Sequence, residues 1–276
     1  MLTSPGRNAG LFDALPQDIE GLTAVGHGLL IHEHLAHFYD VELSEQDRET
    51  VHIRPVEELL SAIVGEDDRP LGVARSPGER TAANCRHFTV LLVSILQSRG
   101  ISARARCGFG SYFTEGSHED HWVCEYWNGS RWVLVDSQID DVQKEKFPID
   151  FDVTDVPRDK FLTAGTAWQL CRAGEKDPDT FGLSFLNETG YWWIAGNMMR
   201  DAAALLGTPL LPWDAWGIMP EPADPVDMAF FDHLATLTEH PGAPTDELKR
   251  LLAHDERIRV PAKVLNTARH REEAIA

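Results

Sequence analysis

A cysteine at the predicted start of a helix is the first feature of this chain that suggests chemistry. Cys85 precedes a mostly apolar run that ends at Gly100, which fits a helix C-cap. The unpaired N–H groups and the positive dipole end of a helix start favour a thiolate, the nucleophilic form of the side chain. The alternative for a lone cysteine is a small core residue. Apolar residues recur at the spacing of one buried helical face: Phe88, Leu91, Leu92, Ile95 and Leu96.

A β-hairpin is predicted farther along the chain. Residues 121–127 and 131–136 are rich in aromatic and β-branched types, and Asn128-Gly129 lies between them. Such a dipeptide favours a type I′ turn, which needs positive φ at both central positions. A two-residue loop would pair Trp127 with Ser130.

This register places His121 directly opposite Asp136. Directly opposed residues have Cβ atoms roughly 4.5–5.5 Å apart, close enough for an imidazole–carboxylate hydrogen bond. The carboxylate would fix the imidazole tautomer, which leaves the second nitrogen free to take a proton from a thiol. Cys85, His121 and Asp136 are therefore a candidate catalytic triad. A half-exposed strand histidine with an aspartate neighbour is the alternative for His121.

A zinc site is a competing interpretation of the same strand. His118, His121 and Cys124 have ligand chemistry at three-residue spacing. On a strand, parity puts His121 and Cys124 on opposite faces, which argues against shared coordination. In the predicted register Cys124 lies opposite Val133 and is a core residue, while His118 belongs to the preceding loop. We expect no metal and no other cofactor.

A group of histidines near the N-terminus is a second candidate metal site. His27, His32, His34 and His37 fall within a predicted helix over residues 22–39. A zinc-protease motif needs a second histidine four residues after the first, and Ala36 stands four residues after His32. We interpret these histidines as the wet face of an amphipathic helix.

Four motifs, in order, resemble the bacterial transglutaminase-like superfamily. They are Asn84-Cys85-Arg-His-Phe, Leu96-Gln-Ser-Arg-Gly-Ile-Ser-Ala-Arg104, His121-Trp-Val and Arg131-Trp-Val-Leu-Val-Asp136. The resemblance covers roughly residues 70–145. It implies an α+β fold with a papain-like transglutaminase core, in which the nucleophile helix packs on an antiparallel sheet, with extra N- and C-terminal helices. It also implies Cys85 as nucleophile, His121 as general base and acid, and Asp136 as the residue that orients the imidazole.

The motifs depart from the family in two places. Ser102 replaces the usual proline, and Asn84 replaces the small or aromatic residue common in the animal cross-linking enzymes. Arylamine N-acetyltransferases resemble the order and spacing too, but their Arg-Gly-Gly-x-Cys signature is absent. Peptide N-glycanases resemble the core but carry paired Cys-x-x-Cys zinc motifs, which this chain lacks.

The resemblance implies acyl transfer through a thioester on Cys85, and it does not name the substrate. The expected acyl donor is a small molecule or a peptide with an amide or ester, and the acceptor is water or an amine. The backbone N–H of Cys85 is one expected oxyanion donor, and Trp122 and Asn84 are candidates for a second donor or for the substrate pocket. Two alternatives stay open: a catalytically silent binding module, and an acyltransferase like the arylamine acetyltransferases.

Composition limits the choice of partners and compartment. Of the 276 residues, 44 are acidic and 25 basic, for a formal charge of −19, so nucleic acid is not an expected partner. No apolar run reaches membrane-spanning length and no signal pattern opens the chain, so we expect no membrane and a cytoplasmic location. Four cysteines without framework spacing fit a reducing compartment.

Three segments are predicted along the chain. Residues 1–65 form a helical N-terminal segment packed on the core, residues 66–165 the catalytic core, and residues 166–276 a mainly helical extension. One continuous domain is the alternative, and the oligomeric state is left open. A strand is predicted over residues 102–109, and helices over 56–64, 161–171, 191–206, 228–237 and 245–254.

Overall fold

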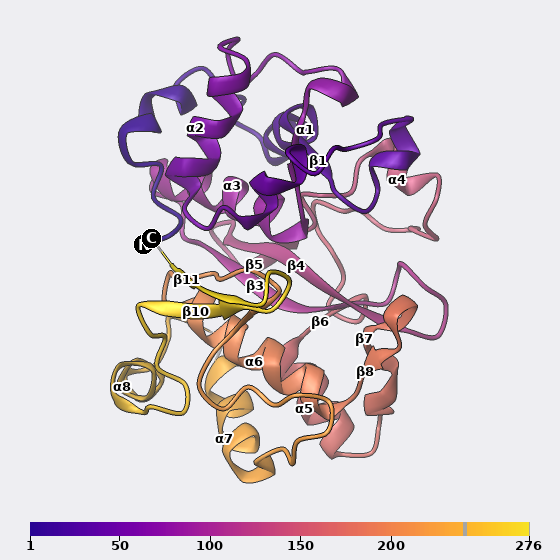
Figure 1. Cartoon of the computed structure of the whole chain (residues 1–276), viewed down its shortest axis with the longest axis vertical. Helices are drawn as coiled ribbons and strands as arrows, with labels where there is room; N and C mark the ends of the chain where they lie inside the picture. Colours follow the sequence, from indigo (N-terminus) through magenta and orange to yellow (C-terminus); the bar gives the residue numbers. More distant parts are fainter. Residues whose placement is uncertain (240–241, 276) are drawn as a thin grey trace. The chain divides into compact units, whose positions relative to one another are not determined.

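The computed structural model describes residues 1–239 and 242–275 and combines helices with sheets of mainly antiparallel strands, as expected for the α+β class (Figure 1). The chain divides into two compact units. The first consists of Met1–Ala105 and Val123–Val156, and the second of Arg106–Trp122 and Pro157–Ala276. The three-part organisation expected from the sequence stays a prediction. Within the described residues, no helix is long and apolar enough to cross a bilayer.

The first unit contains the helix that begins at the candidate nucleophile. This helix, α3 (Cys85–Ser98), contacts α1 (Ile19–Leu29) and α2 (Val56–Glu66). Every residue of α3 from Cys85 to Leu96 is buried, whereas the sequence predicted one buried face. Most polar groups on a buried helix have partners inside the protein, although the hydroxyls of Thr89 and Ser94 have none among the described residues. The short helices of this unit are η1 (Gly6–Phe12), η2 (Ala36–Tyr39), η3 (Asp47–His52), η4 (Pro77–Glu79) and α4 (Asp141–Lys144).

The predicted helix over residues 22–39 is wrong beyond Leu29. Residues Leu30–His32 form strand β1, which pairs in parallel with β2 (Thr81–Ala83) so that His32 lies opposite Ala83. In the predicted amphipathic helix, the outer face of this segment would have been exposed to water. In β1, the backbone N–H and C=O groups instead pair with those of β2, about fifty residues later in the sequence, and this pairing places β1 beside the segment that leads into α3.

The main sheet contains six strands in the order β6-β3-β4-β7-β8, with β5 also paired to β4. The predicted strand over residues 102–109 is confirmed as β3. The pairing of β4 with β7 is parallel, which the sequence did not predict. A second sheet has the order β11-β10-β9. The strands are β3 (Ala103–Gly110), β4 (His118–Trp127), β5 (Trp132–Val135), β6 (Phe161–Thr163), β7 (Phe181–Leu183), β8 (Glu188–Thr189), β9 (Asp214–Ala215), β10 (Lys263–Asn266) and β11 (Arg271–Ala274).

The hairpin forms, but its predicted register is wrong by two residues. Trp127 pairs with Trp132, and the loop between them has four residues rather than two. The Asn128 side chain explains the longer loop, because its Oδ1 accepts hydrogen bonds from the backbone N–H groups of Ser130 and Arg131. The two tryptophan rings close the end of the ladder, with centroids 6.0 Å apart.

The corrected register changes two predicted pairs. Cys124 lies opposite Val135, not Val133. Asp136 immediately follows Val135, the residue that pairs with Cys124. His121 lies three residues before Cys124, so the direct opposition of His121 and Asp136 that the sequence predicted is wrong. A shift of two residues leaves every side chain on its original face of the strand, since the side-chain period is also two.

The second unit is mainly helical. Helices α5 (Ala164–Arg172), α6 (Tyr191–Leu205) and α7 (Met228–Thr238) pack against one another, drawn in orange in Figure 1. The helix predicted from residue 161 begins three residues later, because residues 161–163 form β6 and the Thr163 side chain caps α5. The remaining helices are η5 (Pro178–Thr180), η6 (Ser184–Leu186) and α8 (Asp246–His254), and α8 confirms the helix predicted over residues 245–254.

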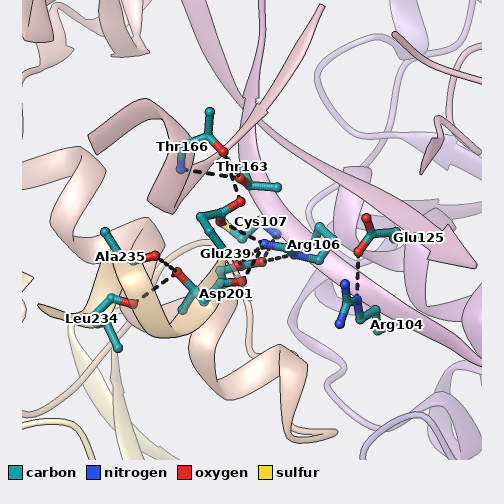
Figure 2. Close-up of polar contacts among 11 residues, drawn as sticks. Arg104, Arg106, Cys107, Glu125, Thr163, Thr166, Asp201, Leu234, Ala235 and Glu239 are labelled. Carbon is teal, nitrogen blue, oxygen red and sulfur yellow. Dashed lines mark hydrogen bonds and ion pairs between the residues drawn. The ribbon is translucent and has the colours of Figure 1, made fainter. Parts of the chain in front are cut away.

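A buried ion pair ties β3 to helix α6 in this unit. Figure 2 shows Arg106 beside Asp201, with their Nη2 and Oδ2 atoms 2.9 Å apart. Asp201 Oδ1 also accepts the backbone N–H of Cys107 at 2.8 Å, and Glu239 Oε1 lies 3.1 Å from the Arg106 guanidinium. Both Arg106 and Asp201 are almost completely buried, so removing either charge would strand the other in the core.

We predict that Asp201→Ala lowers the free energy of unfolding by about 3–5 kcal/mol, because it leaves Arg106 buried with only part of its charge compensated. Urea denaturation measures this change. The matched control is Asp246→Ala, which removes an exposed partner of Lys249 and should cost less than about 1 kcal/mol. Equal effects of the two substitutions would contradict the structural role assigned to Asp201.

Candidate active site

The candidate nucleophile is the first residue of α3, and a side-chain cap holds it there. Asn84 has an extended backbone, and its Oδ1 accepts the N–H of Arg86 at 3.1 Å. The backbone N–H of Asn84 donates in turn to Nδ1 of His87 at 3.3 Å, which completes a reciprocal capping box. Cys85 therefore lies at the N-terminal end of the helix dipole, as the sequence predicted.

Cys85 differs from the other three cysteines in its place at the start of a helix. All four are buried, with 7% of the surface exposed for Cys85, 5% for Cys171 and none for Cys107 and Cys124. Burial raises the pKa of Cys124, with a further contribution from neighbouring Glu125, and burial raises the pKa of Cys171 to about 12. Cys124 and Cys171 are therefore protonated thiols at neutral pH, whereas Cys85 stands at the N-terminal end of α3.

The side chains that follow Cys85 are buried and bind backbone carbonyls. His87 Nε2 donates to the carbonyl of Ile53 at 2.9 Å, and burial lowers the pKa of His87 so that it stays neutral. Arg86 donates to the carbonyl of Arg54 at 2.6 Å. The first turn of α3 is thus fastened to the segment before α2, which fixes the direction in which the helix begins.

Asp136, the predicted orienting carboxylate, is completely buried in the first unit. Its backbone N–H donates to the carbonyl of Val153 at 2.8 Å, and its Oδ1 accepts the N–H of Gln138 at 3.1 Å. The negative charges of Asp140 and Asp136 both act to raise the pKa of His27, but burial outweighs them and lowers it.

A hydrogen-bonded chain holds the loop after Asp136. Gln138 Nε2 donates to Gln143 Oε1 at 3.0 Å, Gln143 Nε2 donates to the Tyr39 hydroxyl at 3.0 Å, and that hydroxyl donates to Asp140 Oδ2 at 2.8 Å. These residues and His27 line a narrow hollow. No local sequence pattern signals this network, because Tyr39 is separated by about a hundred residues from its partners.

His121, the predicted base, lies in β4 within the second unit and is 3% exposed. Aromatic rings approach it, the nearest being Phe113 at a centroid distance of 4.8 Å. Trp122 is completely buried, and its indole Nε1 has no hydrogen-bond partner among the described residues. Asn84 Nδ2 in the first unit is likewise buried without a partner there. Both are donors, as an oxyanion or substrate contact requires.

Asp120, the residue before His121, is anchored to α6. Its Oδ2 accepts the indole N–H of Trp193 at 2.8 Å. His118 opens the strand rather than lying in a loop, and its ring stacks on Phe181 at 4.2 Å. Burial, helped by Lys176, lowers the pKa of His118 to about 4, so it is neutral near pH 7. Within the described residues, no group of three or more His, Cys, Asp or Glu side chains could hold a metal ion.

Residues 62–137 match the family model of the transglutaminase-like superfamily, so this segment is similar to that family. It is about a quarter of the 276-residue chain and includes Cys85, His121 and Asp136. No curated protein and no solved structure gives a significant match. Cys85 and Asp136 belong to the first unit and His121 to the second, so the triad stays a prediction.

We predict that Asn84→Ala lowers the free energy of unfolding by about 1 kcal/mol, because the N–H of Arg86 loses its cap, and that it slows alkylation of Cys85 by iodoacetamide. Asn84→Ser keeps a capping oxygen and should restore stability. The matched control is Thr245→Ala, which removes the cap of α8 and should cost a similar amount without changing the alkylation rate. An alkylation rate that falls equally in both alanine variants would contradict a local role for Asn84.

Glu33 is a second titratable residue next to the start of α3, and sequence analysis did not single it out. Its backbone N–H donates to the carbonyl of Ala83 at 2.8 Å. Its side chain is 10% exposed, with Oε2 at 3.8 Å from Arg48 Nη1 and with Oε1 buried and unpartnered among the described residues. Burial raises the pKa of Glu33 to about 7, although Arg48 acts in the opposite direction.

This carboxyl makes stability depend on pH. The folded state holds the Glu33 proton up to about pH 7, whereas the unfolded chain releases it near pH 4.5. The stabilising effect is therefore present below pH 4.5 and is lost as the pH rises to 7, by up to about 3 kcal/mol. We predict that Glu33→Gln flattens this part of the profile of unfolding free energy against pH, while the exposed Glu45→Gln leaves it unchanged. A wild-type profile that rises over this interval, and that Glu33→Gln does not alter, would count against the assignment.

Proposed function

We propose that this protein is a cysteine-dependent acyl-transfer enzyme with a papain-like transglutaminase core. Cys85 is the proposed nucleophile, His121 the general base and acid, and Asp136 the residue that orients His121. The single observation that carries the proposal is the capped start of α3 inside the transglutaminase-like segment, where Cys85 stands at the positive end of a buried helix.

The proposed reaction begins with deprotonation of Cys85 by His121. The thiolate attacks the carbonyl carbon of an amide or ester and forms a carbon–sulfur bond, and the carbonyl oxygen takes the negative charge. Collapse of this tetrahedral species breaks the bond to the leaving amine or alcohol, which receives the proton from His121. Water or an amine then attacks the thioester and gives its proton to His121. The carbon–sulfur bond breaks, the product leaves, and the Cys85 sulfur takes the proton back from His121.

The oxyanion needs donors that are free in the resting protein. The backbone N–H of Cys85 belongs to the first turn of α3, whose N–H groups have no partner within the helix. Asn84 Nδ2 and Trp122 Nε1 are the proposed side-chain donors, since each is buried without a partner among the described residues. A buried donor without a partner raises the free energy of the resting state. In the transition state, a hydrogen bond from this donor to the developing negative charge would offset that cost.

The proposed acyl donor is a small molecule or peptide, and the acceptor is water or an amine. The formal charge of −19 favours acceptors that carry a positive charge. An arylamine-acetyltransferase-like reaction uses the same thioester and is the closest alternative chemistry. We place the activity in the cytoplasm, because the four cysteines are free and a reducing compartment keeps them so.

The test measures alkylation of Cys85 by iodoacetamide, followed by mass spectrometry. We expect Cys85 to react first, and His121→Ala to slow the reaction on the order of 10²-fold because the thiol loses its base. His118→Ala is the matched control: it removes a histidine three residues earlier in the same strand and should leave the rate unchanged. Asp136→Asn should slow the reaction less than His121→Ala. Equal, slow labelling of the wild type and His121→Ala would indicate a catalytically silent binding module instead.

A further inference from the structure

Three aromatic rings surround the imidazole of His121 within the second unit. Phe113, Tyr112 and Phe161 lie with ring centroids 4.8, 6.1 and 6.4 Å from that of His121. All three contacts are edge-to-face, with interplanar angles between 65° and 88°. The imidazole is therefore bordered by hydrocarbon on the sides that these rings occupy, which gives it a largely apolar surrounding in this unit.

Phe113 is the most exposed of these three rings. Tyr112 and Phe161 are 2% and 1% exposed, whereas Phe113 is only partly buried and leads into the exposed residues Thr114–Gly116. Phe113 also contacts Tyr112, with centroids 4.5 Å apart. Phe113 therefore packs on a buried ring and still exposes apolar surface to water, which a bound apolar group could cover.

The strand before this loop is shaped to admit both rings. A Cβ atom on Gly110 would lie 2.7 Å from a ring carbon of Phe113 and 3.0 Å from one of Tyr112, so only glycine leaves room for them. The next residue, Ser111, is held in place because its backbone N–H donates to the carbonyl of Lys160 at 2.9 Å. The absence of a side chain at Gly110, the last residue of β3, thus allows both rings to lie close to the backbone of this strand.

We propose that Phe113 determines acyl-donor specificity, and that its ring forms the wall against which an aromatic or branched apolar acyl group packs. The proposal rests on the proposed function: if His121 acts on the acyl-thioester, the group next to the reacting carbon must lie close to the ring that borders His121. A small acyl group such as acetyl would not extend far enough to cover Phe113. A bulky apolar group would cover it and gain the corresponding apolar burial.

The test compares hydrolysis of p-nitrophenyl acetate, butyrate and phenylacetate by the full chain. In the wild type we expect kcat/KM to be highest for phenylacetate. Phe113→Ala should lower kcat/KM for phenylacetate about tenfold or more, because an apolar pocket discriminates by about this factor, and change it less than about twofold for acetate. Gly110→Ala displaces the ring without removing it and should shift the preference in the same direction.

The matched control is Phe185→Ala, which removes an exposed phenylalanine from a different loop of the same unit and should leave all three values unchanged. An equal loss for all three esters in Phe113→Ala, or no loss, would overturn the specificity role while leaving the proposed function in place. A wild type that hydrolyses none of the esters and whose Cys85 is not labelled faster than the other three cysteines would overturn both. Thermal unfolding of each variant shows whether it is folded.

Discussion

The hydrogen bond from the Arg86 N–H to Asn84 Oδ1 decides where α3 begins, and the position of Cys85 follows from it. A helix end without a cap frays, so its first residue has no defined direction. Here the cap is reciprocal, because His87 accepts the backbone N–H of Asn84 while its other ring nitrogen binds Ile53. Cys85 is thus held at the N-terminal, positive end of the dipole of a helix that is buried from Cys85 to Leu96.

Because α3 is buried from Cys85 to Leu96, polar side chains in this stretch can find hydrogen-bond partners only inside the protein. Arg86 and His87 bind backbone carbonyls of residues 53–54, whereas the buried hydroxyls of Thr89 and Ser94 have no hydrogen-bond partner among the described residues. The same requirement acts in the second unit, where Arg106 and Asp201 are both buried and satisfy each other. In the first unit, polar contacts between segments far apart in sequence fix the start of α3, which carries Cys85. In the second unit they fix β3, which pairs with β4, the strand that carries His121.

The hairpin shows which features of the fold local sequence patterns predict and which they do not. Asn128-Gly129 and the flanking β-type runs correctly predicted two paired strands. They did not predict the loop length, because the Asn128 side chain can either enter a two-residue turn or cap a four-residue loop. That choice moved the register by two residues, which removed the direct opposition of His121 and Asp136 but kept the face of each side chain.

From the sequence alone, the local features could be deduced: the helix that starts at Cys85, strand β3, the hairpin, and the resemblance to the transglutaminase-like superfamily, which the match over residues 62–137 confirms. These depend on residues close together in the chain, whose spacing is visible in the sequence. Only the tertiary structure revealed the strand at Leu30–His32, the buried Glu33, the Tyr39 network and the rings around His121. Each of these depends on contacts between residues distant along the chain, and such contacts are set by packing and by the pairing of buried polar groups, neither of which has a local sequence period.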